Sequence, residues 1–176
     1  MLKFNSDIIC MKGCDFVGIY GSLIKESKDK STLEKSFKKK NHNFKIYDLH
    51  DSKVLNLPCV KNDDRIREDL KYKIEKGKKG EIAIDPSTGK FIGYVIVNKN
   101  EIIGPLYIEK EYRGYGLSNQ LFEDAIKKYN GKELGVYSDN EIAMNLYKKF
   151  GFEKYSEKNY ADGDKVILMK LNSSRV

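Results

Sequence analysis

A glycine-rich turn is the part of this sequence best suited to chemistry. It runs from Glu111 to Ser118, with glycines at 114 and 116, between an apolar strand-like run and a segment with an apolar helical stripe. A turn in that context presents backbone N–H groups and the positive end of a helix dipole, which together bind phosphate. Glycine lets a ligand approach the main chain closely. The sequence therefore predicts a phosphate site at the start of a helix.

A second feature with chemical consequences lies just before the turn. Gly104 and Pro105 interrupt an apolar run that extends from Glu101 to Glu109. Proline cannot donate to a sheet ladder, and glycine tolerates a bulge. We expect the strand to be distorted there, so that its backbone groups are free to bond a ligand.

The elements that position these two features begin at residue 44. Hydrophobic periodicity and turn residues predict strands at 44–49, 81–85, 90–97, 101–109, 134–137, 152–160 and 165–171. Helices are predicted at 63–76, at 117–129 and from the caps at 138–140 to residue 150. The short turns at 85–89 and 98–100 favour adjacent antiparallel hairpins. The run 91–97 is apolar on both faces, which predicts a central strand.

Composition and charge restrict the class of protein. The chain has 176 residues, of which 40% are hydrophobic and 11% aromatic, as expected for one folded domain. No apolar run has the length of a membrane span, and polar residues interrupt the start too early for a signal peptide. We therefore expect a cytoplasmic protein with no membrane partner.

The segment before residue 45 differs from the rest and is interpreted as an N-terminal extension, residues 1–44, with no assigned role. It includes a possible strand at 15–20 and a short helix from 31 to 37. Seven lysines against two acidic residues between 28 and 45 carry most of the net charge of +7. Because this run lacks arginine and has only two aromatic residues, Phe37 and Phe44, a solvated helix face is favoured over a nucleic-acid site. The domain is predicted at 45–171, followed by a disordered tail at 172–176.

The cysteines do not indicate a disulfide framework. Cys10, Cys14 and Cys59 are odd in number and are interpreted as reduced, buried thiols. A zinc site formed by Cys10 and Cys14 with His42 or His50 is the alternative, although the spacing fits no strong template. No metal is expected.

From residue 44 to 171 the chain resembles the Gcn5-related N-acetyltransferase (GNAT) family. The family's acetyl-CoA motif, a Gln or Arg followed two residues later by Gly-x-Gly or Gly-x-Ala, aligns with Glu111 to Gly116, with Glu111 in place of the usual Gln or Arg. A second family motif matches Asn140, Ala143, Leu146-Tyr147 and Gly151-Phe152. The turn lacks the Lys-Ser/Thr pair of a Walker loop, and the antiparallel order before it argues against a dinucleotide fold.

The resemblance implies an α/β (α+β) fold with a mixed, mostly antiparallel central sheet of about seven strands flanked by helices. It also implies direct transfer of acetyl from acetyl-CoA to a primary amine, with no covalent enzyme intermediate. The positions implied to bind the cofactor are Gly104, Leu106, Tyr107, Ile108, Arg113, Gly114, Tyr115, Gly116, Leu117, Ser118, Asn140 and Tyr147.

Tyr147 occupies the position of the family's general acid, where its phenol would protonate the departing thiolate. Because it shares the apolar face of its helix, a purely structural role is the alternative. For Asn140 the alternatives are that it caps the helix, binds the cofactor or does both. Glu101 is a candidate general base, with Glu109 or a water chain as alternatives and a surface ion pair as the structural reading.

Two hypotheses of function remain open in the sequence. One is an N-acetyltransferase, monomeric or homodimeric, whose acceptor is an amine on a small molecule or a protein. The other is a noncatalytic acyl-CoA-binding or interaction module that holds an acidic partner through the lysine-rich segment. Acceptor binding is expected from residues 51–80, the last hairpin and the N-terminal extension.

Overall fold

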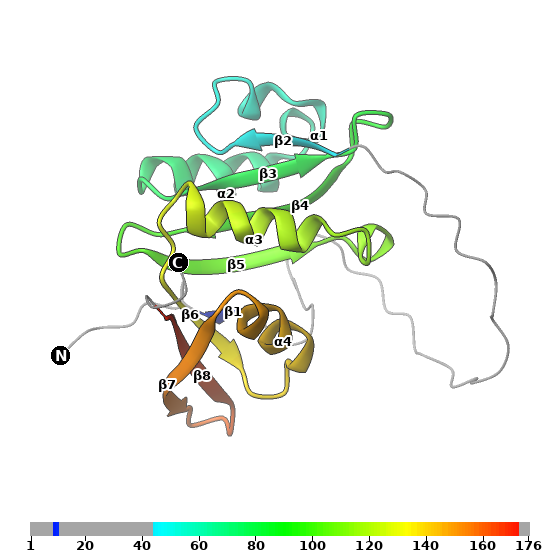
Figure 1. Ribbon diagram of the computed structural model, residues 1–176. Helices are drawn as coiled ribbons and strands as arrows, with labels where there is room; N and C mark the ends of the chain where they lie inside the picture. Colours follow the sequence, from blue (N-terminus) through cyan, green and yellow to red (C-terminus); the bar gives the residue numbers. More distant parts are fainter. Residues whose placement is uncertain (1–8, 11–43, 173–176) are drawn as a thin grey trace, which may run out of the picture.

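The structure is a computed structural model that describes residues 9–10 and 44–172. The predicted strand at 15–20, the helix at 31–37 and the lysine-rich run before Lys45 lie outside the described residues. So do Cys14, His42 and residues 173–176 of the predicted tail. The described part is a single mixed sheet with helices on both faces (Figure 1), which is the predicted α/β (α+β) fold.

The first half of the sheet is antiparallel. It consists of β2 (Lys45–Asp48), β3 (Lys79–Ile84), β4 (Phe91–Val97) and β5 (Ile102–Ile108), each paired with the next. All residues of β4 except Phe91 are buried. The prediction of a central strand covered on both faces is therefore confirmed for this half.

Three short helical elements connect β2 to β3 on one face of the sheet: η3 (Val54–Asn56), α1 (Pro58–Lys61) and α2 (Asp64–Glu75). The predicted helix 63–76 corresponds to α2, whose N-cap Asp63 accepts hydrogen bonds from the backbone N–H groups of Arg65 and Ile66. This bonding satisfies two of the N–H groups that a helix start leaves unpaired.

The second half of the sheet follows the glycine turn. After η4 (Lys110–Tyr112), α3 (Leu117–Lys127) crosses to β6 (Glu133–Tyr137), and α4 (Glu141–Lys149) leads into the hairpin of β7 (Phe152–Asn159) and β8 (Lys165–Leu171). The strand order is β2-β3-β4-β5-β6-β8-β7, and only β5 and β6 in this path are parallel. The seven predicted strands are all present.

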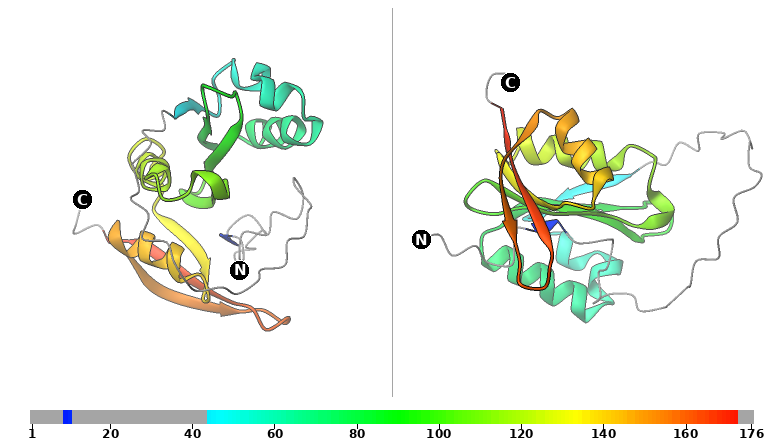
Figure 2. Two further views of the ribbon diagram at one scale, coloured as in Figure 1. Left: turned by 90° about the vertical axis from the view of Figure 1, so that its right-hand side faces the viewer. Right: turned by 90° about the horizontal axis from the view of Figure 1, so that it is seen from below.

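The sheet is split between β5 and β6. The ladder that joins them contains only the pairs Ile102–Glu133 and Ile103–Leu134, and beyond these pairs the two strands diverge (Figure 2). The two-residue strand β1 (Ile9–Cys10) pairs in parallel with Gly135 and Val136 of β6. Because β8 pairs along the other edge of β6, β1 lies within the split, which widens towards the end of β5 that leads into the glycine turn.

Two hydrophobic cores lie on opposite faces of the sheet. The core under α3 and α4 includes Phe122, Tyr147 and Phe152 together with buried residues of β4 and β6. The core under α1 and α2 includes Leu49, Val60, Ile66, Leu70 and Tyr94. Strand β5 contributes side chains to both, so it separates the two faces at the split.

Candidate active site

The glycine turn has the backbone conformation of an open phosphate site. Gly114 and Gly116 have φ values of 83° and 87°, in the left-handed region that glycine adopts without strain. Gly116 is the N-cap of α3 and has no side chain to cap its first N–H groups. A Cβ atom at either glycine would meet no heavy atom within 4 Å. Space for a ligand therefore lies directly at the start of the helix.

Two side chains fix the turn to the sheet. The Arg113 guanidinium donates through Nε to the carbonyl of Ile108, 2.9 Å away, at the end of β5. The Tyr112 hydroxyl donates to Oδ2 of Asp85 at 2.9 Å, in the hairpin between β3 and β4. Hydrogen bonds from Ser87 and from Tyr112 hold the pKa of Asp85 well below its usual range. The turn is thus anchored both to the end of β5 and to the hairpin between β3 and β4.

The expected bulge is present in β5. Val95 and Val97 of β4 face Leu106 and Ile103, so three steps along β5 match two along β4. Gly104 and Pro105 together stand opposite the single residue Ile96, so the strand is distorted where the sequence predicts it. Leu106 and Ile108 pack on the α3 side, whereas the Tyr107 side chain packs on the α2 side. The ladder to β6 stops at Ile103, immediately before the bulge.

Tyr147 lies in α4 with its side chain in the core. It is 2% exposed, and its ring centroid is 4.9 Å from that of Phe122 in α3. Asn140, the N-cap of α4, accepts a hydrogen bond from the Ala143 N–H at 3.1 Å. The capping role of Asn140 is therefore observed, while a ligand role for either residue stays a prediction.

Glu101 lies apart from the open end of the split. It is not part of β5 but of the turn before it, where it has a φ of 61°. Its carboxylate forms an ion pair with Lys132 at 2.8 Å and accepts a hydrogen bond from Asn130. These contacts are at the closed end of the split, beside the first residues of β6. The expected surface ion pair is therefore present, and a role as base stays a prediction.

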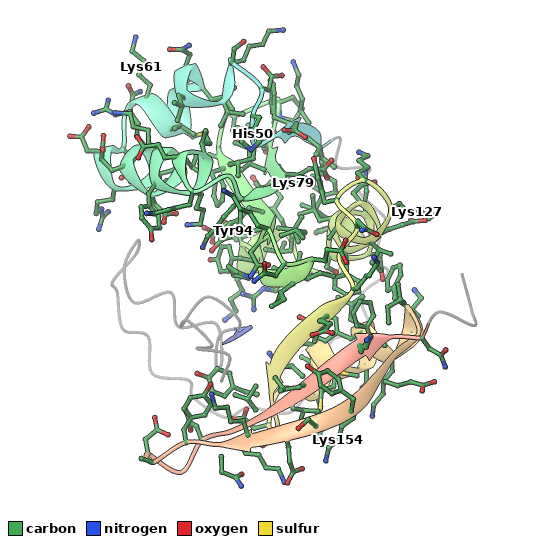
Figure 3. The ribbon with its side chains drawn as sticks, turned by 90° about the vertical axis from the view of Figure 1, so that its left-hand side faces the viewer. His50, Lys61, Lys79, Tyr94, Lys127 and Lys154 are labelled. Carbon is green, nitrogen blue, oxygen red and sulfur yellow. The ribbon has the colours of Figure 1, made fainter. Side chains whose placement is uncertain are left out.

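A pocket of about 740 Å³ lies on the α1–α2 side of β4 and β5. Figure 3 shows Tyr94 on that side of the sheet. The Glu109 carboxylate lines the pocket and accepts a hydrogen bond from the Tyr107 hydroxyl at 2.9 Å. The lining residues are Pro58, Cys59, Asn62, Asp63, Ile66, Thr88, Gly89, Lys90, Phe91, Tyr94, Tyr107, Glu109, Glu111 and Tyr112.

The pocket combines segments that are far apart in the sequence. Its α1–α2 wall falls within residues 51–80, where acceptor binding was expected. The sequence pattern did not predict the pocket floor on β4 or the lining residues from the hairpin between β3 and β4. Burial raises the pKa of the Cys59 thiol, which lines this wall. The pocket and the glycine turn share Glu111 and Tyr112, so the phosphate site and the pocket are adjacent.

The residues present fit acetyl-CoA. The open start of α3 suits its diphosphate, and the strand edge freed at the bulge suits its amide-containing arm. No group of three or more His, Cys, Asp or Glu side chains within residues 44–172 is arranged to hold a metal ion. Among the same residues, no helix combines the length and apolar character needed to cross a bilayer.

Comparison with known proteins agrees with this geometry. Residues 59–173 match the model of the acetyltransferase (GNAT) domain. The chain is 35% identical over 82 residues to an N-alpha-acetyltransferase of Sulfurisphaera tokodaii, covering 42% of this chain and 48% of that protein. It is 33% identical over 87 residues to N-alpha-acetyltransferase 30 of Schizosaccharomyces pombe, covering 42% and 57%. The chain spans about half the length of these curated relatives.

Solved structures show the same fold. The ribosomal-protein-S18-alanine N-acetyltransferase of Escherichia coli superposes with a TM-score of 0.53 at 17% identity, covering 73% of this chain and 93% of that chain. The family model matches more than half of the sequence and includes the glycine turn, the bulge and both motif helices. The chain therefore belongs to the GNAT acetyltransferase family.

Proposed function

We propose that this protein transfers an acetyl group from acetyl-CoA directly to a primary amine of a small molecule or a protein. The observation that carries the proposal is the uncapped glycine turn at the start of α3, next to a bulge that ends the β5–β6 ladder. A phosphate site next to a freed strand edge matches the diphosphate of CoA and the amide-containing arm that adjoins it.

The donor is assigned to one continuous stretch of backbone and to α4. The N–H groups from Arg113 to Ser118 would bind the diphosphate, and the edge of β5 from Gly104 to Ile108, which includes Leu106 and Tyr107, would bond the arm. Acetyl-CoA, when bound, supplies the acetyl group as a thioester. An N–H group at the bulge would hydrogen-bond the acetyl oxygen as negative charge develops on it, which lowers the barrier.

Transfer needs two proton movements. The amine nitrogen forms a bond to the acetyl carbon, the bond from that carbon to the CoA sulfur breaks, and the amine loses a proton. The Tyr147 hydroxyl on α4 is the proposed donor of the proton that the sulfur receives. Phe122 holds the Tyr147 ring in place, which supports a fixed position for that hydroxyl.

The proton acceptor is proposed to be Glu109 rather than Glu101. Glu109 lines the pocket, and the Tyr107 hydroxyl orients its carboxylate. Glu101 is engaged by Lys132 and Asn130 at the closed end of the split. A general base must reach the proton that it abstracts, directly or through one water, and Glu109 lies at the open end.

The pocket beside β5 is the proposed acceptor site. Two of the relatives are N-alpha-acetyltransferases by name, which supports the amino group at the start of a polypeptide as one acceptor class. A primary amine on a small molecule is the other class. The hydrogen-bonded pair of Tyr107 and Glu109 in the pocket lining suits either of them.

The experiment that tests this function measures CoA release from acetyl-CoA with a panel of small amines and of peptides with free amino termini, with mass spectrometry of the products. We expect release that depends on the amine, and a product heavier by one acetyl group. Gly116→Glu should abolish cofactor binding by filling the turn with a carboxylate. Tight binding of acetyl-CoA without release for any acceptor would instead establish the noncatalytic module.

A further inference from the structure

The pocket beside β5 has excess negative charge. Its lining includes the carboxylates of Asp63, Glu109 and Glu111 but a single basic residue, Lys90. Asp63 is used as the N-cap of α2. Within the part of the chain that the structure describes, neither Glu109 nor Glu111 forms an ion pair with Lys or Arg. A cation bound in this pocket would interact favourably with both carboxylates.

The floor of the same pocket is aromatic. The rings of Phe91 and Tyr94 have centroids 6.0 Å apart, and those of Tyr94 and Tyr107 are 6.1 Å apart. All three residues line the cavity. Faces of aromatic rings attract organic cations, and the attraction is strongest where water is excluded. The pocket is thus lined both by carboxylates and by aromatic rings, the two kinds of group that bind an organic cation.

Glu111 links this pocket to the unusual residue of the cofactor motif. The family's usual residue at this position is Gln or Arg, neither of which is negatively charged. In the structure Glu111 belongs to η4 and lines the pocket. A negative charge at this position repels a diphosphate and attracts a cation in the pocket.

We infer that the preferred acceptor carries a second cationic group in addition to the amine that is acetylated, and that Glu111 recognises this group in the aromatic pocket. The acceptor class is a diamine or polyamine, or a peptide with a basic residue near its amino terminus. This inference rests on the proposed function for the identity of the acetylated amine. The binding of the cationic group itself does not depend on transfer.

The kinetic test compares two acceptors that differ only in the second charge, 1,4-diaminobutane and butylamine. We expect kcat/KM to be about tenfold higher for the diamine, and the preference to fall towards one in Glu111→Gln. Lys90→Gln should raise the preference, because it removes the one basic residue of the lining. Glu75→Gln, an exposed carboxylate at the far end of α2, should leave the ratio unchanged. Using the ratio cancels any common effect on turnover.

A binding test without transfer keeps the two proposals separable. Choline has a quaternary ammonium with no N–H to acetylate, and 3,3-dimethylbutan-1-ol is its neutral isostere. By calorimetry we expect choline to bind at least about fivefold more tightly to the wild type, and this difference to shrink in Glu111→Gln. Acetylation with equal preference for both amines and no selective binding of choline would overturn the inference and leave the function intact. Selective choline binding without any acetylation would overturn the function alone.

Discussion

The ring of Tyr147 in α4 lies 4.9 Å from the ring of Phe122 in α3, so the candidate acid is held by the helix that begins at the glycine turn. Tyr147 is 2% exposed and its ring packs in the core. The proton transfer proposed for this residue involves only its hydroxyl. Packing and catalysis at this residue can therefore be separated by removing one oxygen atom.

Tyr147→Phe is expected to lower kcat by about a hundredfold, the lower range for loss of a general acid, while KM for acetyl-CoA changes by less than about threefold. The ring contact with Phe122 is retained, so the midpoint of thermal unfolding should stay within about 2 °C of the wild type. CoA release and thermal unfolding measure the two quantities. Tyr155→Phe, which removes the hydroxyl of a half-exposed tyrosine in β7, is the matched control. An unchanged kcat would show that Tyr147 is only a core residue.

Gly116→Ala is expected to weaken CoA binding by about tenfold, because a methyl group enters the space at the start of α3. The same substitution adds the strain of a left-handed backbone, about 1–2 kcal/mol. Gly163→Ala controls for that strain, since Gly163 has a φ of 90° and equally open surroundings in the β7–β8 turn. Calorimetry with CoA and urea unfolding compare the variants. Equal CoA affinities in the two variants would contradict a phosphate site at Gly116.

The candidate bases are distinguished by the pH dependence of kcat with butylamine. Glu109→Gln is expected to lower kcat by about a hundredfold at pH 7, with partial recovery as hydroxide and water replace the carboxylate at higher pH. Glu101→Gln should stay within about twofold, because its carboxylate is committed to Lys132 and Asn130. The reverse order of effects would reassign the base to Glu101.

A buried carboxylate far from the pocket should make stability depend on pH. Glu81 in β3 is 3% exposed, and burial raises its pKa, with the charge of Asp124 adding to the rise and a 2.9 Å bond from Lys128 opposing it. Tyr129 donates to both Asp48 and Glu81 in the same cluster. The folded state therefore binds the proton of Glu81 more tightly than the unfolded state does.

The direction of this pH dependence follows from the linkage between proton binding and folding. A raised folded-state pKa contributes stability that is fully present below the unfolded pKa and is lost as pH rises through the folded pKa. Glu81→Gln should remove this contribution, so the free energy of unfolding of the variant relative to wild type rises between pH 4 and pH 8. Urea unfolding at several pH values measures it, with Glu75→Gln as an exposed control. If the difference in free energy of unfolding between Glu81→Gln and wild type did not change with pH, the raised pKa of Glu81 would be contradicted.

Sequence patterns predicted the elements that depend on local chemistry. Gly116 ends a turn and begins a helix, and Gly104-Pro105 disrupts a strand ladder, and neither effect depends on distant residues. The glycine turn and the bulge could therefore be predicted from the sequence. The pocket was not, because Cys59, Tyr94 and Glu109 meet only after α1 and α2 fold over β4. The pairing of Glu101 with Lys132 was likewise hidden, since it depends on a long-range parallel ladder. The three-residue η3 and η4 are too short to show a period.

The split in the sheet has a consequence for finding the acceptor. Because two residue pairs alone connect β5 to β6, the strands on either side are expected to open by partial unfolding more readily than β3 and β4. A molecule bound across the split would hold β5 and β6 together and slow amide hydrogen exchange in β6. Protection of Glu133 and Leu134, the two residues of β6 that pair with β5, would then report occupancy of the site for compounds of any chemistry, before a reaction product is known.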